Sequence, residues 1–474
     1  MNPSSNTASA QPNPLGVRPL PQLLRSFAIP SVLAMLVSSL YNIVDQIFIG
    51  NGVGYLGNAA TNVAFPLTTI CLSIALLIGV GGAARFNLSL GHGDNDQARR
   101  TVGAAFSMMV VLGLSYMVIV ELFLPYLLRL FGATAEVMPY ATDYTRITAV
   151  GMPLLIITNA MSNLARADGS PRYSMTCMLL GAVINTILDP IFIFVCHWGV
   201  AGAAWATVIG QAASFLMALN YLRLFRNIRL TLPDFRPSLR EWKRIASLGL
   251  SNSCNQLAIT FVQIVLNNSL TYYGALSVYG SEIPLAASGI VIKVNAILTG
   301  IIVGISQGTQ PIISFNYGAG QYDRVRGAYA LAIKISLAIS AVGFVAFECF
   351  PRQIVALFGT GDPLYFEFAV MFMRCYLFMV VVNCVQLLSS NFFAAIGKPI
   401  RGVLLSLTRQ VFFLVPLLLI LPRFFGLTGI LFTAPIADFI AFVTSVLVVR
   451  GEMRRLRQAE ADRAAQVQPQ PSLS

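Results

Sequence analysis

Long apolar stretches, each of about 20 residues or more, recur along the whole chain and are separated by short polar connections. A helix needs about 20 apolar residues to cross the hydrocarbon core of a bilayer. The pattern therefore predicts an all-α polytopic membrane protein that lies in a lipid bilayer. Twelve transmembrane helices are expected, at residues 24–49, 58–83, 102–124, 139–164, 173–196, 200–222, 247–273, 283–310, 328–349, 367–392, 402–421 and 427–449.

Positive charge is distributed unevenly between the connections. The termini and the loops after even-numbered segments hold most of the 31 lysine and arginine residues, whereas the opposite loops hold only Arg129, Arg352 and Arg423. Basic loops stay on the cytoplasmic side of a cell membrane. We therefore predict a multi-pass protein of the cytoplasmic membrane, with both termini in the cytoplasm.

The two halves of the chain repeat each other. The segment Gly91–Arg99 reappears 227 residues later as Gly318–Arg326, and Gly199 recurs as Gly426 at the same shift. Each half holds six predicted spans, so the copies have the same orientation, and we predict two six-helix lobes related by a pseudo-two-fold axis along the membrane normal. Two such lobes are typical of transporters. The predicted units are a disordered cytoplasmic tail (1–22), the N-terminal lobe (23–222), a basic cytoplasmic connection (223–244), the C-terminal lobe (245–450) and a cytoplasmic C-terminal tail (451–474).

Composition argues against several other classes of protein. Residues are 56% apolar and only 11% charged, whereas a soluble domain carries about a quarter charged residues. The net charge of +12 comes from loops and not from a basic-aromatic stripe, so no nucleic acid partner is expected. The chain has two histidines and no HExxH, phosphate-loop or paired-histidine motif, so we expect neither an enzyme nor a cofactor.

One predicted span combines polar groups at membrane depth. Asn185 and Asp189 are four residues apart and therefore share one face of a helix. Pro190 follows directly and leaves the carbonyl group of Thr186 without its usual donor. An ionisable residue inside a membrane is costly and is generally functional. The alternative for Asp189 is a hydrogen bond that packs helices together.

Five motifs lie in one order along nearly the whole chain: Val44–Gly50, Gly91–Arg99, Asn185–Pro190, Gly199–Thr207 and Gly304–Pro311. In these motifs the sequence resembles the multidrug and toxic compound extrusion (MATE) family, in particular its bacterial DinF/MepA-like branch. The resemblance implies two six-helix lobes around a V-shaped cavity. It also implies export driven by the inward flow of protons or sodium ions.

The resemblance further implies a coupling site in the N-terminal lobe, formed by Asp45, Asn185, Asp189 and Thr207. Pro30 occupies a position where the family often has a proline that permits the first helix to bend, and Pro190 is a second helix-bending candidate. The C-terminal lobe has no carboxylate that matches Asp45, and Val415 stands opposite Asp189. We therefore expect coupling in the N-terminal lobe alone.

Two carboxylates taken out of water cannot both remain ionised without a large cost. A proton relieves that cost, and so does Na+, which suits the oxygen ligands of these four side chains. Binding of H+ or Na+ is expected to change how the first helix packs near Pro30. The alternative for Asp45 is a position at the membrane interface. Three later residues, Lys293, Arg409 and Asp438, are expected to line a cavity or to form an internal ion pair.

These observations predict a cation-coupled antiporter, acting as a monomer, that exports small amphipathic and often cationic organic compounds by alternating access. The alternative is a flippase or exporter of a lipid-linked or other amphiphilic metabolite on the same fold. A flippase for pyrophosphate lipids should place several cationic groups in its cavity, for which Lys293 and Arg409 are the candidates. A passive channel is disfavoured because no filter-like segment is present.

Overall fold

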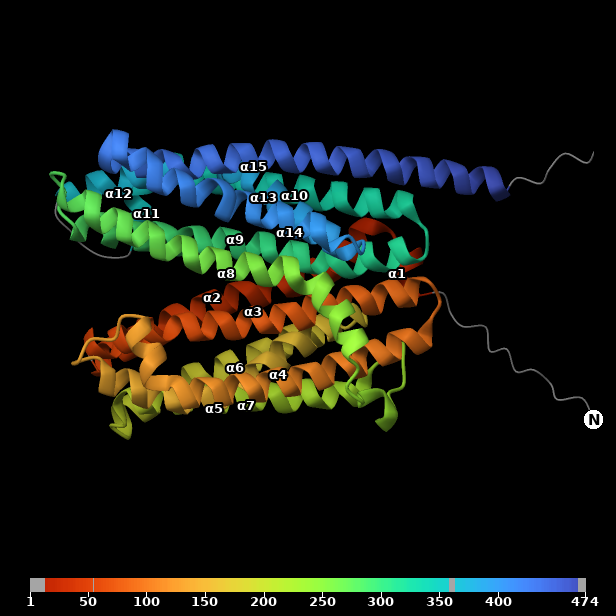
Figure 1. Ribbon diagram of the computed structural model, residues 1–474, viewed down its shortest axis with the longest axis horizontal. Coiled ribbons are helices and arrows are strands. Elements are labelled where there is room, and N and C mark those ends of the chain that lie inside the picture. Colours follow the sequence, from red (N-terminus) through yellow and green to blue (C-terminus); the bar gives the residue numbers. More distant parts are fainter. Residues whose placement is uncertain (1–12, 54, 358–362, 468–474) are drawn as a thin grey trace, which may run out of the picture.

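The computed structural model describes residues 13–53, 55–357 and 363–467. In these residues the chain is helical and contains no strand. The long helices run along the longest axis of the molecule in two groups (Figure 1). The first group is α2 (Leu20–Val53), α3 (Tyr55–Gly91), α4 (Asn95–Leu130), α5 (Met138–Ala167), α6 (Pro171–Pro190), the π-helix η1 (Ile191–Val195) and α7 (Gly199–Leu224). The short helix α1 (Pro14–Val17) precedes it and contacts α9 (Glu282–Gly318) of the second group.

The second group follows a connection that contains one short 3-10 helix, η2 (Leu232–Phe235). It comprises α8 (Leu239–Ala275), α9 (Glu282–Gly318), α10 (Tyr322–Cys349), α11 (Pro351–Ala356), α12 (Pro363–Tyr376), α13 (Val380–Ala395), α14 (Pro399–Leu407), the π-helix η3 (Thr408–Leu414) and α15 (Val415–Val467). We call the end of the bundle at which α1 lies and α15 finishes the basic end (Figure 1, right).

The number of spans agrees with the twelve apolar segments. Nine helices of the described residues are long and apolar enough to cross a membrane, and α12 with α13 forms a tenth span that is bent by 50°. The helix α8 is as long as α9 but more polar, and it supplies another. The twelfth span lies within the stretch Pro399–Asp462. This stretch contains two spans and not one, because the chain turns back at Gly426, where φ is 60° and ψ is −142°.

The predicted N-terminal tail needs correction, whereas the tenth span and the predicted C-terminal tail differ from the prediction only in detail. The predicted disordered tail 1–22 is wrong from residue 13 onward, because α1 and the start of α2 occupy that stretch, while residues 1–12 lie outside the described residues. The tenth segment, 367–392, is not one straight helix. The predicted tail 451–474 continues α15 as far as Val467.

The helical extension of α15 is fixed to the C-terminal lobe by charge. The carboxylate of Glu452 is fully buried and forms salt bridges with Lys398 and Arg401, which lie at the start of α14. Further along, Glu460 receives a hydrogen bond of 2.8 Å from Nη2 of Arg326 on α10. The extension is therefore attached at two levels.

The duplication of the sequence recurs in the backbone. Positive φ angles occur at three equivalent pairs of glycines: Gly93 and Gly320 (79° and 70°), Gly169 and Gly397 (84° and 77°), and Gly199 and Gly426 (57° and 60°). Left-handed backbone favours glycine because a Cβ atom would clash there. A Cβ atom on Gly202 would lie 2.9 Å from the carbonyl oxygen of Phe192, and one on Gly429 would lie 2.7 Å from that of Leu421. The same close turn is thus built twice.

The two lobes meet where α2 packs on α9 and α3 packs on α8. Glycines permit this close approach, since a Cβ atom on Gly304 would lie 2.6 Å from Cα of Val32. One on Gly249 would lie 1.8 Å from the carbonyl oxygen of Leu77. Both contacts lie in the parts of α2 and α3 nearer the basic end. At Gly300, further from that end, the nearest atom would be 3.7 Å away. The seam is therefore tightest at the basic end.

Candidate functional site

A cavity of about 340 Å³ lies inside the N-terminal lobe, among α2, α3, α5, α6 and α7. Every residue that lines it belongs to this lobe. Its polar lining includes Asn42, Asp45, Asn159, Asn185, Thr207 and Gln211. Three of the four residues predicted for coupling thus face one hollow, and the fourth, Asp189, is one helical turn from Asn185.

Two small residues bring α6 and α7 close enough for the site to form. A Cβ atom on Gly210 would lie 2.6 Å from the carbonyl oxygen of Gly181, so neither position has room for a side chain. At this spacing, Nδ2 of Asn185 donates to Oγ1 of Thr207 at 3.2 Å. The same amide also donates to Oδ1 of Asp189 at 3.3 Å, as the four-residue spacing on one helix allows.

Asp45 on α2 and Asp189 on α6 come from different helices, and their carboxyl groups lie close enough to influence each other's charge. Asp189 is fully buried, Asn185 is 2% exposed, and Asp45 is half-buried at the cavity wall. Asp45 therefore lies at the cavity wall, and the carboxyl groups of Asp45 and Asp189 share an environment that water reaches poorly.

Several oxygen atoms of this cluster have no donor among the described residues. They are Oδ1 of Asp45, Oδ1 of Asn185 and Oδ2 of Asp189, and each is buried. A buried acceptor without a donor is costly, and a proton or a hard cation satisfies it. The residues present therefore fit a site for H+ or Na+, with the hydroxyl group of Thr207 beside it.

The two candidate bending residues lie at different kinds of position. Pro30 is buried within α2, which continues as a helix on both sides of it. Pro190 is the last residue of α6, and the chain continues through the π-helix Ile191–Val195. In this helix the N–H of Cys196 donates to the carbonyl oxygen of Ile191 at 2.9 Å. A π-helix at a functional position is a recurrent feature of proteins.

The polar residues expected in the C-terminal lobe behave differently from one another. Nε of Arg409 on η3 donates to Oδ1 of Asp438 on α15, and both side chains are largely buried. Lys293 is exposed on α9 and forms no ion pair in the part of the chain that the structure describes. The expected internal ion pair is thus formed by Arg409 and Asp438 without Lys293.

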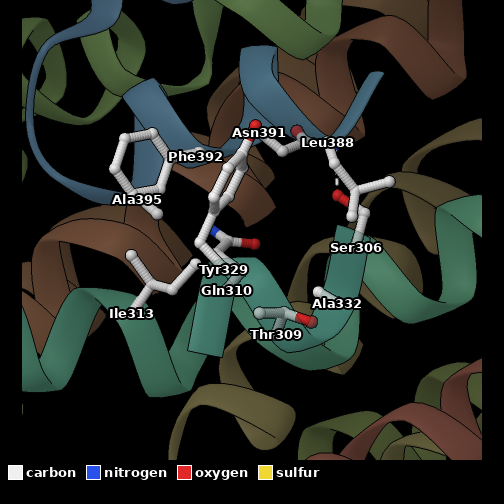
Figure 2. Close-up of a pocket in the computed structure, with 10 residues that line it drawn as sticks. All are labelled: Ser306, Thr309, Gln310, Ile313, Tyr329, Ala332, Leu388, Asn391, Phe392 and Ala395. Carbon is white, nitrogen blue, oxygen red and sulfur yellow. Dashed lines mark hydrogen bonds between the residues drawn. The ribbon is translucent and has the colours of Figure 1, made fainter. Parts of the chain in front are cut away.

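The C-terminal lobe also contains a hollow, but a much smaller one of about 10 Å³, between α9, α10 and α13 (Figure 2). Asn391 donates to Oγ of Ser306 at 2.7 Å, and Gln310 donates to the carbonyl oxygen of Val80 in the other lobe at 3.0 Å. No carboxylate lines this space, which is about the size of one water molecule. The lobes thus share a backbone plan and differ in chemistry.

Sequence reasoning missed several residues of the N-terminal cavity. Tyr41 and Gln211 line it, and each lies four residues from a predicted site residue, so helical spacing could have found them. Tyr144 and Asn159 on α5 also line it. Nothing in their local sequence marks them, because only the packing of α5 against α6 and α7 brings them to the cavity.

Comparison with known proteins identifies the family. Residues 30–191 and 253–420 match the family model named MatE. The chain belongs to this family. MATE family proteins are membrane transporters, so the chain is a multi-pass transporter and not an enzyme. The predicted family and fold class are confirmed.

Among curated proteins, the chain is similar to the multidrug export protein MepA of Staphylococcus haemolyticus. The two are 27% identical over 435 residues, which is 91% of this chain and 93% of that protein. It is also similar to MepA of Staphylococcus aureus strain N315, with 26% identity over 436 residues, 91% of this chain and 94% of that one.

Solved structures resemble it over nearly the whole chain. A crystal structure of MATE in complex with MaL6 has a TM-score of 0.88 and 24% identity, and it covers 95% of this chain and 100% of that one. A MOP superfamily transporter from Pyrococcus furiosus has a TM-score of 0.86 and 25% identity, covering 94% and 98% of the two chains. The two-lobed, twelve-span arrangement is therefore that of the MATE fold.

Proposed function

We propose that this MATE family protein is a cation-coupled antiporter that exports amphipathic, often cationic, organic compounds by alternating access. The main support is the group of buried, donorless oxygens on Asp45, Asn185 and Asp189 at one wall of the cavity. No cofactor is needed for this activity, because the gradient of H+ or Na+ supplies the free energy.

Coupling requires that the ion bind the two conformations of the transporter with different affinities. Asp45 lies on α2, whereas the other three members of the site lie on α6 and α7, so an ion held by all four fixes α2 against the rest of the lobe. Because α2 also packs on α9 of the other lobe, a change in this contact is transmitted to the seam. Pro30 lies on that path and is the proposed bending point.

The chemistry of the cavity favours a drug exporter over a flippase for phosphate-bearing lipids. Its lining combines aromatic and methionine side chains, including Tyr41, Phe65, Tyr144 and Met152, with neutral amides. Such walls adapt to varied apolar and cationic compounds. No lysine or arginine lines the cavity, so a pyrophosphate group would find no counter-charge there. The similar proteins named for multidrug export agree with this choice.

We place the protein in the cytoplasmic membrane of a cell, as a monomer. In the proposed orientation, the basic end faces the cytoplasm. Basic residues gather at that end, as expected for the cytoplasmic side. The seam between the lobes is tightest there, so the conformation seen here is closed toward the proposed cytoplasmic side.

The test is uptake of a fluorescent cationic dye into inverted membrane vesicles under an imposed proton gradient, an imposed sodium gradient, or neither. We expect uptake to require one of the gradients and to be lost in the variant Asp189→Asn. The matched control is Asp323→Asn, which changes an exposed aspartate at the basic end. Uptake by Asp189→Asn at the wild-type rate would contradict the proposal, and uptake without any gradient would indicate a passive pore.

A further inference from the structure

A second large cavity, of about 680 Å³, lies at the basic end and is separate from the proposed coupling site. It is enclosed by α1 and the start of α2, by the turn between α5 and α6, and by the end of α7 with the residues that follow it. Three arginines from different segments line it: Arg18 after α1, Arg172 in the first turn of α6, and Arg226 after α7. Neither the coupling site nor the proposed substrate cavity uses any of them.

The charges of these three arginines are not neutralised by the described residues. None of the three forms a salt bridge there, and Nη1 of Arg226 reaches only the carbonyl oxygen of Gly169, at 3.5 Å. The acidic residue in the lining, Asp168, has its carboxylate engaged by other donors. These are the hydroxyl group of Tyr221 (2.8 Å), the N–H of Arg226 (2.7 Å), and the N–H and Nδ2 of Asn227 (3.1 and 2.8 Å). Asp168 therefore fixes the turn after α7.

A fourth arginine, Arg166, stands two residues before Asp168 of the cavity lining. Arg166 is only 3% exposed, and it contacts Ser174 on α6 and Gln307 on α9 without any carboxylate partner. Its Nε has no acceptor among the described residues. The first turn of α6 also borders the cavity, and Ser170 at its N-cap makes no side-chain capping bond. Free amides at a helix start add partial positive charge.

Apolar side chains also line the cavity. Leu15, Leu23 and Phe27 form part of the lining together with the arginines, and Leu224, which also lines it, is about half exposed. A simple inorganic anion would use the cationic groups only, whereas an amphiphile would use both surfaces. Basic pockets at the cytoplasmic ends of membrane helices bind anionic lipid headgroups by this combination. We propose that this cavity binds an anionic phosphate group, carried either by a phospholipid of the adjoining leaflet or by a soluble organic phosphate.

The site would join the two lobes. Nη2 of Arg324, on α10 of the C-terminal lobe, donates to the carbonyl oxygens of Leu15 and Arg18, at 3.0 and 2.8 Å. The segment that carries Arg18 is thus attached to the C-terminal lobe, whereas Arg172 and Arg226 belong to the N-terminal side. A phosphate held by all three arginines therefore stabilises the closed seam at the basic end.

The experiment uses the full-length protein in neutral detergent and native mass spectrometry. Wild type is compared with a cavity variant, Arg18→Gln/Arg172→Gln/Arg226→Gln. The matched control is Arg229→Gln/Arg236→Gln/Arg240→Gln, which removes the same charge from three exposed arginines that do not line the cavity. The probes are dioleoylphosphatidylglycerol, dioleoylphosphatidylcholine and sn-glycerol 3-phosphate.

We expect wild type and the control to retain phosphatidylglycerol more strongly than phosphatidylcholine, and the cavity variant to lose about tenfold or more of that retention. If glycerol phosphate displaces the lipid from wild type, soluble organic phosphates share the site. If it does not, the bilayer lipid is the ligand. Equal retention by the cavity variant and the control would overturn the proposal, as would equal retention of the two lipids by wild type.

A second set of measurements distinguishes loss of lipid binding from misfolding of the variant. The single variant Arg172→Gln alters a side chain with no hydrogen bond or ion pair among the described residues, so it should fold normally and show an intermediate loss. Phosphatidylglycerol should raise the thermal unfolding midpoint of wild type and the control, but not that of the cavity variant. Unchanged binding by Arg172→Gln together with an equal rise in all three proteins would contradict the site. No transport is needed for either readout, so the result is independent of the coupling mechanism.

Discussion

Arg85 on α3 and Glu241 on α8 form a salt bridge of 3.0 Å that crosses from the N-terminal to the C-terminal lobe. Glu241 also accepts hydrogen bonds from Gln97 on α4 and from Arg244, each at 3.0 Å. Its side chain is 13% exposed, so the carboxylate is only partly screened by water. One acidic group thus links three helices at the basic end, where the seam is tightest.

Replacing Glu241 with glutamine should weaken the closed basic end. The change removes the charge that holds Arg85 across the seam, and we expect a shift of about tenfold toward conformations open at that end. Distances between spin labels on α3 and α8, measured by double electron–electron resonance, report this shift. The control Glu460→Gln removes a charge that acts within the C-terminal lobe alone. Identical distance distributions for Glu241→Gln and wild type would contradict this role.

The glycines of the seam predict a sharp dependence on side-chain size. A Cβ atom on Gly308 would lie 2.6 Å from Cα of Ala28, so Gly308→Ala forces two backbones apart and should cost about 1–3 kcal/mol. Gly289→Ala on the same helix is the control, because a Cβ atom there meets nothing within 4 Å. Thermal unfolding of the purified proteins should give a lower midpoint for Gly308→Ala than for Gly289→Ala. Equal midpoints would show that the seam accommodates the added methyl group without strain.

Asp45 and Asp189 should not be equivalent in transport. Asp45 is half-buried and is the only member of the proposed ion site on α2, so Asp45→Asn removes one ligand and leaves the buried cluster on α6 and α7 intact. We expect transport to continue with a changed dependence on pH or sodium concentration. The measurement is the initial rate of dye uptake across a series of pH values and sodium concentrations. A profile that overlays that of wild type would remove Asp45 from the site.

The ion pair of Arg409 and Asp438 predicts a strong non-additivity. Breaking a buried pair leaves one charge without a partner, so Arg409→Met alone should cost about 3–5 kcal/mol. The double variant Arg409→Met/Asp438→Leu removes both charges and should recover most of that loss. A double-mutant cycle on thermal or denaturant unfolding measures the coupling. If the two single losses simply add, the pair does not contribute as an ion pair.

The sequence predicted the fold well where the signal was local. Apolar length located the spans, and the shift of 227 residues anticipated the recurrent backbone at Gly199 and Gly426. It missed the bend between α12 and α13, because the residues Tyr376–Val380 include no glycine or proline. The polar residues after Arg450 predicted a tail, whereas the structure has helix there. This helix is fixed by the ion pairs of the buried Glu452 with Lys398 and Arg401.

In the candidate site, too, local patterns predicted some residues, whereas others depend on how the helices pack. The pair Asn185 and Asp189 followed from four-residue spacing on one helix, and the structure joins them as expected. The place of Asp45 beside Asp189 was implied only by resemblance to a family, since the two residues are far apart in sequence. Tyr144 enters the cavity through the packing of α5, which no local pattern encodes.

The attachment of α15 through Glu452 and Glu460 makes its last turns a rigid rod that follows the C-terminal lobe. When a rigid helix rotates, the displacement of a residue grows with its distance from the rotation axis. A rocking motion of a few degrees within the membrane therefore displaces residue 467 more than the residues of the bundle. A fluorophore placed there without a flexible linker, and paired with another on α4, offers a direct optical readout of the transport cycle in single molecules.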